Sequence, residues 1–286
     1  MAILLDAFAQ DIGDPVYRAG LAREFASALP FPHLVLDGLF AAPFLRSIES
    51  EFAGMAACWR ECSSNREHTW RSVAGAPFGP ATSAYFDLVH RNSFVAFMEA
   101  ITGTNDLVVD QSLHGGGMHE ARDGGWFDIH RDFNRHPRTL LHNEMVVLTY
   151  LNEGWNDDFG GHLEVWCHRE KRVVRSIAPE LGRTVILKHG QYSFHGHTRP
   201  VATGGTRVRR SVACYYYRSK PRLVDLSSAM PTVFALDQKG RAHPMAAKTL
   251  TGSSSTPVRS LNAALRMLTP PVIWNYARYA LRNLSK

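Results

Sequence analysis

Short runs of strand-forming residues follow one another between residues 105 and 220, and this pattern limits the chain to a few folds. Gly, Asn, Asp and Pro separate the runs, as they do in the turns between antiparallel strands. Many short strands at such spacing are typical of an antiparallel barrel or a jelly roll. The predicted strands cover residues 106–113, 126–132, 143–151, 161–167, 172–177, 183–188 and 208–217.

Helical patterns occupy the part of the chain that precedes these strands. Apolar residues recur at helical spacing over residues 14–30 and 83–101, and Pro43 opens a third helix. Residues 33–40 predict a short strand followed by a turn. Residues 60–80 are polar and contain several Gly and Pro residues, so we expect a long loop there.

After Lys220 the strand pattern ends, and two basic amphipathic helices are predicted at 257–268 and 270–285. Their apolar stripe is short and Pro270-Pro271 fixes a bend, so we expect them to pack on the barrel or to form a homodimer contact. Weak contact with an anionic membrane surface is the alternative. The predicted domains are an N-terminal helical support region with an entry strand at 1–104, a β core at 105–220 and a C-terminal extension at 221–286.

The composition excludes several classes of protein. Hydrophobic residues make up 45% and charged residues 20% of the chain, which is typical of a globular protein and not of a disordered or fibrous one. No apolar run reaches the roughly 18 residues of a membrane-spanning helix. The net charge of +6 is far below that of a dedicated nucleic-acid binder, although it suits an anionic substrate. Residues 1–6 lack a signal-peptide core, so we expect a cytoplasmic protein.

His130 and Asp132 are the strongest candidates for chemistry. Alternate side chains of a β-strand share a face, so this imidazole and this carboxylate point to the same side of the strand predicted at 126–132. His195 directly follows a strand-like run and is the third candidate, with His197 as the alternative. Two imidazoles and one carboxylate form the facial triad that binds non-haem Fe(II) and leaves positions open for substrate and O₂.

Arg209 is the candidate for binding an anion. It shares a face with Ser211 on the strand predicted at 208–217, because side chains alternate along the strand. A guanidinium inside a barrel lined by apolar residues is costly unless an anion pairs with it. Guanidinium groups bind carboxylates in a bidentate manner, so the sequence predicts a buried carboxylate ligand at this position.

Several motifs follow one another along the chain in a characteristic order. They are His130-x-Asp132, Tyr150-Leu151-Asn152, Gly160-Gly161-His162-Leu163-Glu164, His195 and Arg209-x-Ser211 with Tyr215-Tyr216. In this order they resemble the prolyl 4-hydroxylase-like branch of the Fe(II)/2-oxoglutarate-dependent dioxygenases, over roughly residues 30 to 218. The resemblance implies a mainly β fold with flanking helices, whose core is a double-stranded β-helix, or jelly roll.

The resemblance also implies a reaction. Such an enzyme hydroxylates an unactivated C–H bond with O₂ while 2-oxoglutarate is decarboxylated to succinate and CO₂. By position, His130, Asp132 and His195 match the catalytic iron ligands. The presence of Asp132 favours hydroxylation over halogenation, because related halogenases have a small residue where this carboxylate stands.

The co-substrate site follows from the same resemblance. Arg209 matches the residue that binds the distal carboxylate of 2-oxoglutarate, with Tyr150 and Ser211 beside it. The segment that precedes Arg209 is longer than in compact members of the group, so Arg207 and Arg210 are alternative ligands.

A second interpretation of the same sequence is a non-catalytic, cupin-like jelly roll that binds a sugar or a nucleotide. Such a protein does not need an inward Arg209 next to two histidines and an aspartate, which favours the enzyme. For the enzyme, a free amino acid, a peptidyl residue, a sugar and a natural-product intermediate all fit as substrates, because specificity in this group lies in variable loops.

Overall fold

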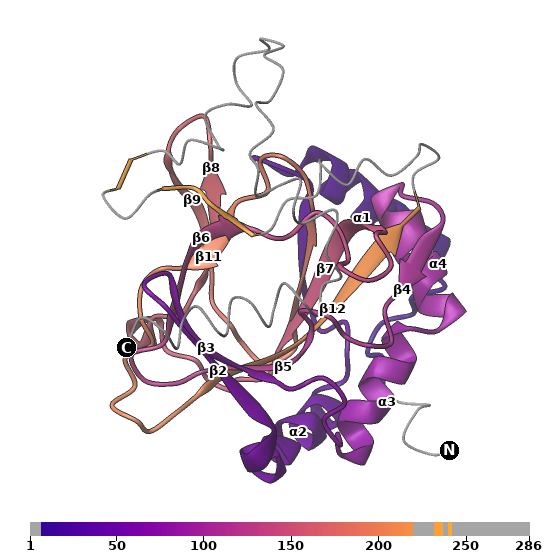
Figure 1. Ribbon diagram of the computed structural model, residues 1–286. Helices are drawn as coiled ribbons and strands as arrows, with labels where there is room; N and C mark the ends of the chain where they lie inside the picture. Colours follow the sequence, from indigo (N-terminus) through magenta and orange to yellow (C-terminus); the bar gives the residue numbers. More distant parts are fainter. Residues whose placement is uncertain (1–6, 220–231, 237–239, 242–286) are drawn as a thin grey trace, which may run out of the picture. The chain divides into compact units, whose positions relative to one another are not determined.

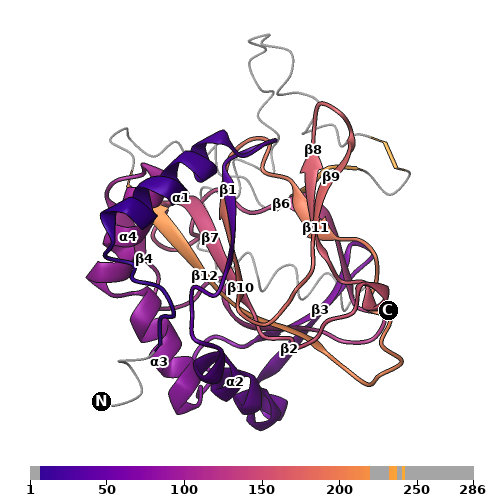
Figure 2. The ribbon, with the colours of Figure 1, turned by 180° about the vertical axis from the view of Figure 1, so that it is seen from behind.

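The computed structural model describes residues 7–219, 232–236 and 240–241, and it is built around an antiparallel sheet that curls into a jelly roll. The α-helices gather on one side of the curled sheet (Figure 1 and Figure 2). The predicted fold class, mainly β with flanking helices and a jelly-roll core, is therefore confirmed. None of the described helices is long and apolar enough to cross a membrane.

The domain boundaries expected from the sequence stay predictions. The helices expected at 257–268 and 270–285 lie outside the described residues. All described residues belong to one compact unit of the chain.

Strands from the whole described part of the chain enter one sheet. They are β1 (His33–Asp37), β2 (Trp59–Ser63), β3 (Glu67–Ser72), β4 (Leu107–Val109), β5 (Gly117–Ala121), β6 (Trp126–Arg131), β7 (His142–Tyr150), β8 (Leu163–Cys167), β9 (Arg172–Ile177), β10 (Arg183–Lys188), β11 (His195–His197), β12 (Arg209–Arg218) and β13 (Val233–Phe234). The order across the sheet is β1-β10-β7-β12-β5-β3-β6-β11-β8-β9. In addition, β2 pairs with β3, β4 with β12 and β13 with β6.

The helices begin at residues that favour a helix start. They are α1 (Pro15–Ser27), α2 (Ala42–Glu51), α3 (Pro80–Val89) and α4 (Asn92–Thr102), with 3₁₀ turns at Phe52–Cys58 and Asp157–Phe159. Pro15, Pro43 and Pro80 stand in first turns, where the missing N–H of proline has no cost. Asp14 caps α1 by accepting a hydrogen bond of 2.8 Å from the backbone N–H of Val16.

Side-chain alternation along β7 and β12 separates the main core from the interior of the jelly roll. Val147 and Val212 point to the outer face and share a core cluster with helix residues such as Phe97. Val146 and Ala213 point to the inner face and belong to a second apolar cluster. The same two strands therefore hold the helices on one face and line the interior with the other.

Two sequence predictions for the N-terminal part of the chain are wrong. Residues 60–80, expected as a loop, contain most of the β2–β3 hairpin. Because polar residues occupy both faces of this hairpin, it lacks the alternation that identifies a strand. The single helix expected at 83–101 is divided into α3 and α4, because the backbone of Arg91 is extended (φ −70°, ψ 149°) although the apolar spacing continues across it.

Strand β5 is absent from the strands that the sequence predicts. The run Gly115-Gly116-Gly117 at its start has low strand propensity. The structure explains the glycine at position 116, because a Cβ atom there would lie 2.5 Å from the carbonyl oxygen of Ala213 on β12. The close approach of β5 to β12 therefore requires glycine at this position.

Candidate active site

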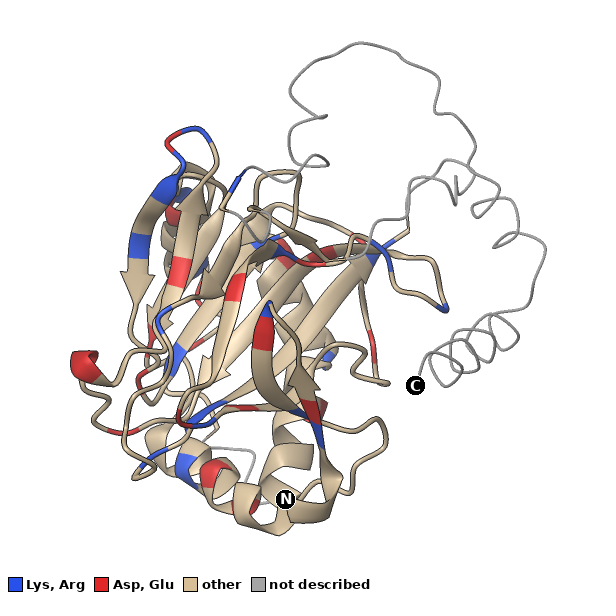
Figure 3. Ribbon diagram, turned by 60° about the vertical axis from the view of Figure 1, so that its left-hand side comes forward, with Lys and Arg blue, Asp and Glu red and all other residues tan. Residues whose placement is uncertain are grey.

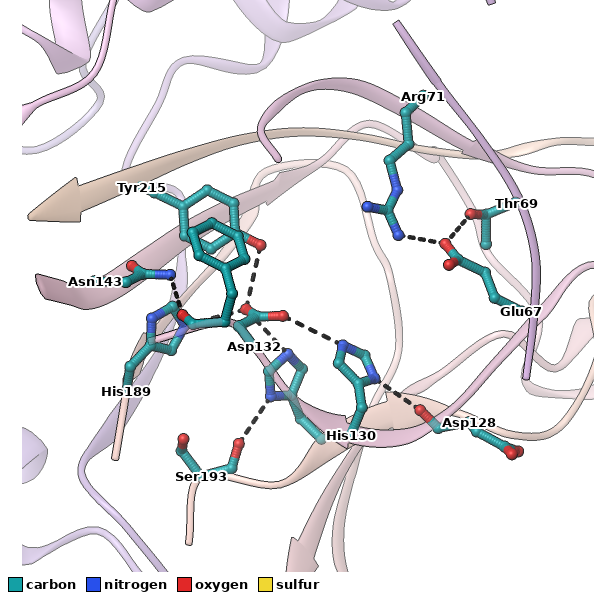
Figure 4. Close-up of polar contacts among 12 residues, drawn as sticks. Glu67, Thr69, Arg71, Asp128, His130, Asp132, Asn143, His189, Ser193 and Tyr215 are labelled. Atoms are coloured by element: carbon teal, nitrogen blue, oxygen red, sulfur yellow. Dashed lines mark hydrogen bonds and ion pairs between the residues drawn. The ribbon is translucent and has the colours of Figure 1, made fainter. Parts of the chain in front are cut away.

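The ends of β6 and β11 bring three of the predicted site residues together. His130 on β6 lies opposite His195 on β11 in the antiparallel register, and Asp132 follows the end of β6. One ligand atom from each of these side chains lies within 4.8 Å of the other two. No side chain of the three is more than 9% exposed. Figure 4 shows His130 and Asp132 pointing towards one another.

Both imidazoles turn the same nitrogen towards the shared point. His130 Nδ1 lies 2.7 Å from the carbonyl oxygen of Asp128, and His195 Nδ1 lies 3.1 Å from that of Ser193. A carbonyl oxygen only accepts, so each Nδ1–H donates and each Nε2 keeps a free lone pair. Burial lowers the pKa of His195 to about 4, so this imidazole is neutral near pH 7.

Asp132 is the anionic member of the cluster. One carboxylate oxygen lies 3.4 Å from His130 Nε2, and the other lies 3.8 Å from His195 Nε2. Two imidazole lone pairs and a carboxylate that face one another repel unless a cation lies between them. This donor set therefore fits Fe(II).

Two residues to which the sequence analysis gave no role contact the Oδ2 atom of Asp132. His189 Nε2 lies 3.1 Å from it, and the Tyr215 hydroxyl donates a hydrogen bond to it over 3.2 Å. Tyr215 shares the inner face of β12 with Arg209 and Ser211. Side-chain alternation along this strand could therefore have placed Tyr215 at the site. His189 directly follows β10, and no motif marks it.

Arg209 is buried in the interior of the jelly roll, at 7% exposure. Its Nε donates a hydrogen bond of 2.6 Å to the carbonyl oxygen of Gly161, and its Nη2 donates one of 3.1 Å to the hydroxyl of Tyr150. Arg209, Tyr150 and Ser211 line the same cavity as the two histidines and the aspartate. Within the described part of the chain no carboxylate forms an ion pair with Arg209, so this cation is available for an anionic ligand.

The alternative ligands considered from the sequence lie elsewhere. Arg210 points to the opposite face of β12 and pairs with two carboxylates. Arg207 donates to the backbone oxygen of Glu153 at an exposed position. His197 lines the cavity but lies outside the cluster that His195 completes.

Comparisons with known proteins agree with this geometry. Residues 116–217 match the family model of the 2OG-Fe(II) oxygenase superfamily. No curated protein matches the chain significantly. A prolyl-4-hydroxylase from Pseudomonas putida is similar in structure, with a TM-score of 0.51 and 17% sequence identity over 71% of this chain and 100% of that one.

Two further solved structures share the fold. A prolyl hydroxylase from Trichoplax adhaerens, in complex with a hypoxia inducible factor oxygen degradation domain peptide fragment, gives a TM-score of 0.52 and 15% identity over 73% of this chain and 94% of that one. A structure of prolyl 4-hydroxylases from Phytophthora capsici gives 0.50 and 16% over 77% of this chain and 72% of that one. The jelly roll is therefore the fold that these proteins have in common.

Proposed function

Because residues 116–217 match the family model of the 2OG-Fe(II) oxygenase superfamily, we propose that His130, Asp132 and His195 bind Fe(II) in this protein. The protein is an Fe(II)- and 2-oxoglutarate-dependent dioxygenase that hydroxylates a C–H bond of an unidentified substrate. The observation that carries the proposal is the convergence of three ligand atoms within 4.8 Å, on side chains that are at most 9% exposed.

Each residue of the cluster has a separate task in this proposal. Fe(II), when bound, supplies the redox chemistry by which O₂, 2-oxoglutarate and substrate give succinate, CO₂ and the hydroxylated product. His130 and His195 offer neutral Nε2 lone pairs, because backbone carbonyls accept the protons on Nδ1. Asp132 offers a negative charge, and its burial keeps water away from that charge.

We assign 2-oxoglutarate to the cavity region around Arg209. The guanidinium matches the distal carboxylate of this dianion. The Tyr150 hydroxyl accepts a hydrogen bond from Arg209, so its own proton is free to be donated to the same carboxylate. Burial raises the pKa of Tyr150 despite the nearby Arg209, which keeps this proton in place. Ser211 adds a hydroxyl to the same wall.

We further propose a cytoplasmic enzyme that acts on a small-molecule or peptidyl substrate and binds no nucleic acid. The net charge of +6 supports the last point, because dedicated nucleic-acid binders carry far denser positive charge. The same proposal has the C-terminal helices pack on the jelly roll or form a homodimer contact, with weak contact with an anionic membrane surface as the alternative.

Succinate formation from 2-oxoglutarate tests the iron assignment. We expect succinate from the wild-type protein only when Fe(II) is added. Asp132→Ala should abolish succinate formation and weaken Mn(II) binding measured by titration. Asp157→Ala removes an exposed carboxylate, at 88% exposure, and should behave as the wild type does. Turnover of Asp132→Ala at the wild-type rate would refute the assignment, and a wild-type protein that binds metal but forms no succinate would favour the cupin-like binding protein.

A further inference from the structure

A second guanidinium, that of Arg71, lines the same cavity as Arg209, and the proposed function leaves it without a role. Arg71 lies on β3, opposite His119 of β5 in the sheet. Thr69 precedes it by two residues on the same face of the strand and also lines the cavity. Only 23% of the Arg71 side chain is exposed. The wall formed by β3 therefore presents a largely buried cation to the cavity.

The Arg71 guanidinium lies close to the proposed metal site. Its central carbon lies 5.5 Å from the centre of the Phe127 ring, and that ring stacks on the imidazole of His130 with 3.8 Å between ring centres. Figure 4 shows Arg71 directed towards the space that His130 and Asp132 border. A small molecule that binds to Arg71 is thus within reach of the reacting centre.

Glu67, on the same strand, orients Arg71. Its Oε1 accepts hydrogen bonds from the Thr69 hydroxyl, at 2.6 Å, and from Arg71 Nη2. Thr69 and Arg71 line the cavity, whereas Glu67 does not. A guanidinium carries five N–H groups. The Nε and Nη1 groups of Arg71 have no hydrogen-bond partner among the described residues, so they remain available for a ligand.

We propose that Arg71 binds an oxyanion of the prime substrate, and that this enzyme acts on a small molecule that carries a carboxylate. The inference rests on the proposed function, because it uses the same cavity and the same metal site. Arg209 already matches the distal carboxylate of 2-oxoglutarate. Glu67 pairs with one edge of this second guanidinium, so the N–H groups on its other edge are free to bind a second anion.

The neighbouring His119 is neutral, so it neither pairs with Arg71 in place of an anion nor adds a second positive charge to bind the anion. Burial and the adjacent Arg71 lower the pKa of His119 to about 3, so its imidazole is neutral near pH 7. Its Nε2 atom is buried and has no hydrogen-bond partner in the part of the chain that the structure describes. His119 also lines the cavity, and it therefore offers a polar contact to a ligand that Arg71 holds.

Fractionation of a metabolite extract by anion exchange at pH 7 tests this proposal. Each fraction is added to the Fe(II)- and 2-oxoglutarate-loaded enzyme, and succinate formation is measured. We expect the fractions that the anion exchanger retains to stimulate succinate formation. The unretained fraction should leave succinate formation at the rate measured without any fraction. Coupling of carboxylates to ethanolamine should remove the stimulation, whereas phosphatase treatment should leave it. The reverse result would assign the oxyanion to a phosphate and overturn the carboxylate.

Variants of the hairpin link the effect to Arg71. Arg71→Gln should raise the concentration of the active fraction needed for half-maximal stimulation at least about tenfold, because charge-assisted hydrogen bonds are lost. Arg71→Lys should recover part of this loss. Arg66→Gln is the matched control, because Arg66 lies next to β3, pairs with Asp128 at 2.9 Å and does not line the cavity.

Three results would overturn the proposal. They are stimulation by the unretained fraction, stimulation by no fraction, and a loss in Arg71→Gln that Arg66→Gln shows equally. Arg71→Gln could instead raise only the apparent constant for 2-oxoglutarate. That result would assign Arg71 to the co-substrate and would also contradict the proposal. A direct Mn(II) titration distinguishes failure of the proposed function from failure of the Arg71 proposal. If the proposed function is wrong, the wild-type protein binds no metal in this titration.

Discussion

Tyr215 and His189 fix the carboxylate of Asp132 from behind, by contacts to its Oδ2 atom. Residues that orient a metal ligand contribute about 10–100-fold to metal affinity. We expect Tyr215→Phe to weaken Mn(II) binding by about tenfold or more, because the variant keeps the ring and loses the hydrogen bond to Asp132. Tyr217→Phe is the control, since among the described residues the Tyr217 hydroxyl hydrogen-bonds only the backbone oxygen of His114, at 3.5 Å. Equal Mn(II) affinities for the two variants would contradict the prediction.

Arg209 is expected to dominate the affinity for 2-oxoglutarate. Each buried charge-assisted hydrogen bond contributes about 1.5–3 kcal/mol, and a guanidinium makes two to a carboxylate. Arg209→Ala should therefore raise the apparent constant for 2-oxoglutarate by about two orders of magnitude or more, as measured by succinate formation at varied 2-oxoglutarate. Arg207→Ala, at an exposed position, should change it little. The opposite ranking would move the anion site to Arg207.

The candidate site could be predicted from the sequence only where a residue belongs to a local pattern. His130 and Asp132 alternate on one strand, and Arg209 alternates with Ser211 on another. The structure brings these residues into one cavity, but the assignment of iron and 2-oxoglutarate to them stays a prediction. Arg71 and the other side chains that come from the unpredicted hairpin had no such pattern, because their role depends on packing between distant segments.

At the scale of elements, β1 and β9 are the two ends of the sheet, and one side-chain contact joins them. His33 Nδ1 donates to the carbonyl oxygen of Phe31 at 2.8 Å, and its Nε2 accepts a hydrogen bond of 3.0 Å from Arg175 Nη1. This arrangement requires a neutral imidazole. Burial, together with the charge of Arg175, lowers the pKa of His33.

The neutral state of His33 makes folding stability depend on pH. A group with a lowered folded-state pKa stabilises the fold above its ordinary pKa of 6.5, and this contribution is lost as the pH falls from there towards the folded-state pKa. The free energy of unfolding of the wild type should therefore fall more steeply between pH 7.5 and 5.5 than that of His33→Gln. Urea denaturation at both pH values measures the difference. Parallel pH profiles for the two proteins would show that His33 is not a source of the dependence.

The fold could be predicted where strands have a clear boundary and a clear apolar pattern. The strands expected at 172–177 and 183–188 have these bounds in the structure. Strands β3 and β5 could not be predicted from the sequence, because both contribute to the cavity wall. Their inward positions carry polar residues or glycine, which suit a site and weaken the signal of a strand.

At the scale of the whole molecule, the exposed strand β9 and the turn that precedes it are strongly basic (Figure 3). The exposed basic residues of this hairpin are Arg169, Lys171, Arg172 and Arg175. Charged side chains on an edge strand oppose pairing with a second sheet. A homodimer contact through β9 is therefore disfavoured, and the proposed dimer requires another surface.

The predicted C-terminal helices carry the membrane hypothesis, and a comparison of two chain lengths tests it. Each Lys or Arg near anionic lipid adds about 1 kcal/mol to binding. We nevertheless expect the full chain and a chain that ends at Arg241 to sediment equally with phosphatidylserine vesicles, because the apolar stripe predicted at 270–285 is short. Neutral vesicles are the control. Greater sedimentation of the full chain with anionic vesicles alone would establish the membrane contact.

His130 and His195 face one another across β6 and β11 although they are far apart in the sequence. Their pairing closes a long loop, so the metal site exists only once distant parts of the sheet have joined. A ligand that binds only the folded chain stabilises it, by about 2.7 kcal/mol at a concentration 100 times its dissociation constant. Proteases degrade the unfolded chain in preference to the folded one. Iron bound at the proposed site would then lengthen the lifetime of this protein in the cell as well as support its turnover.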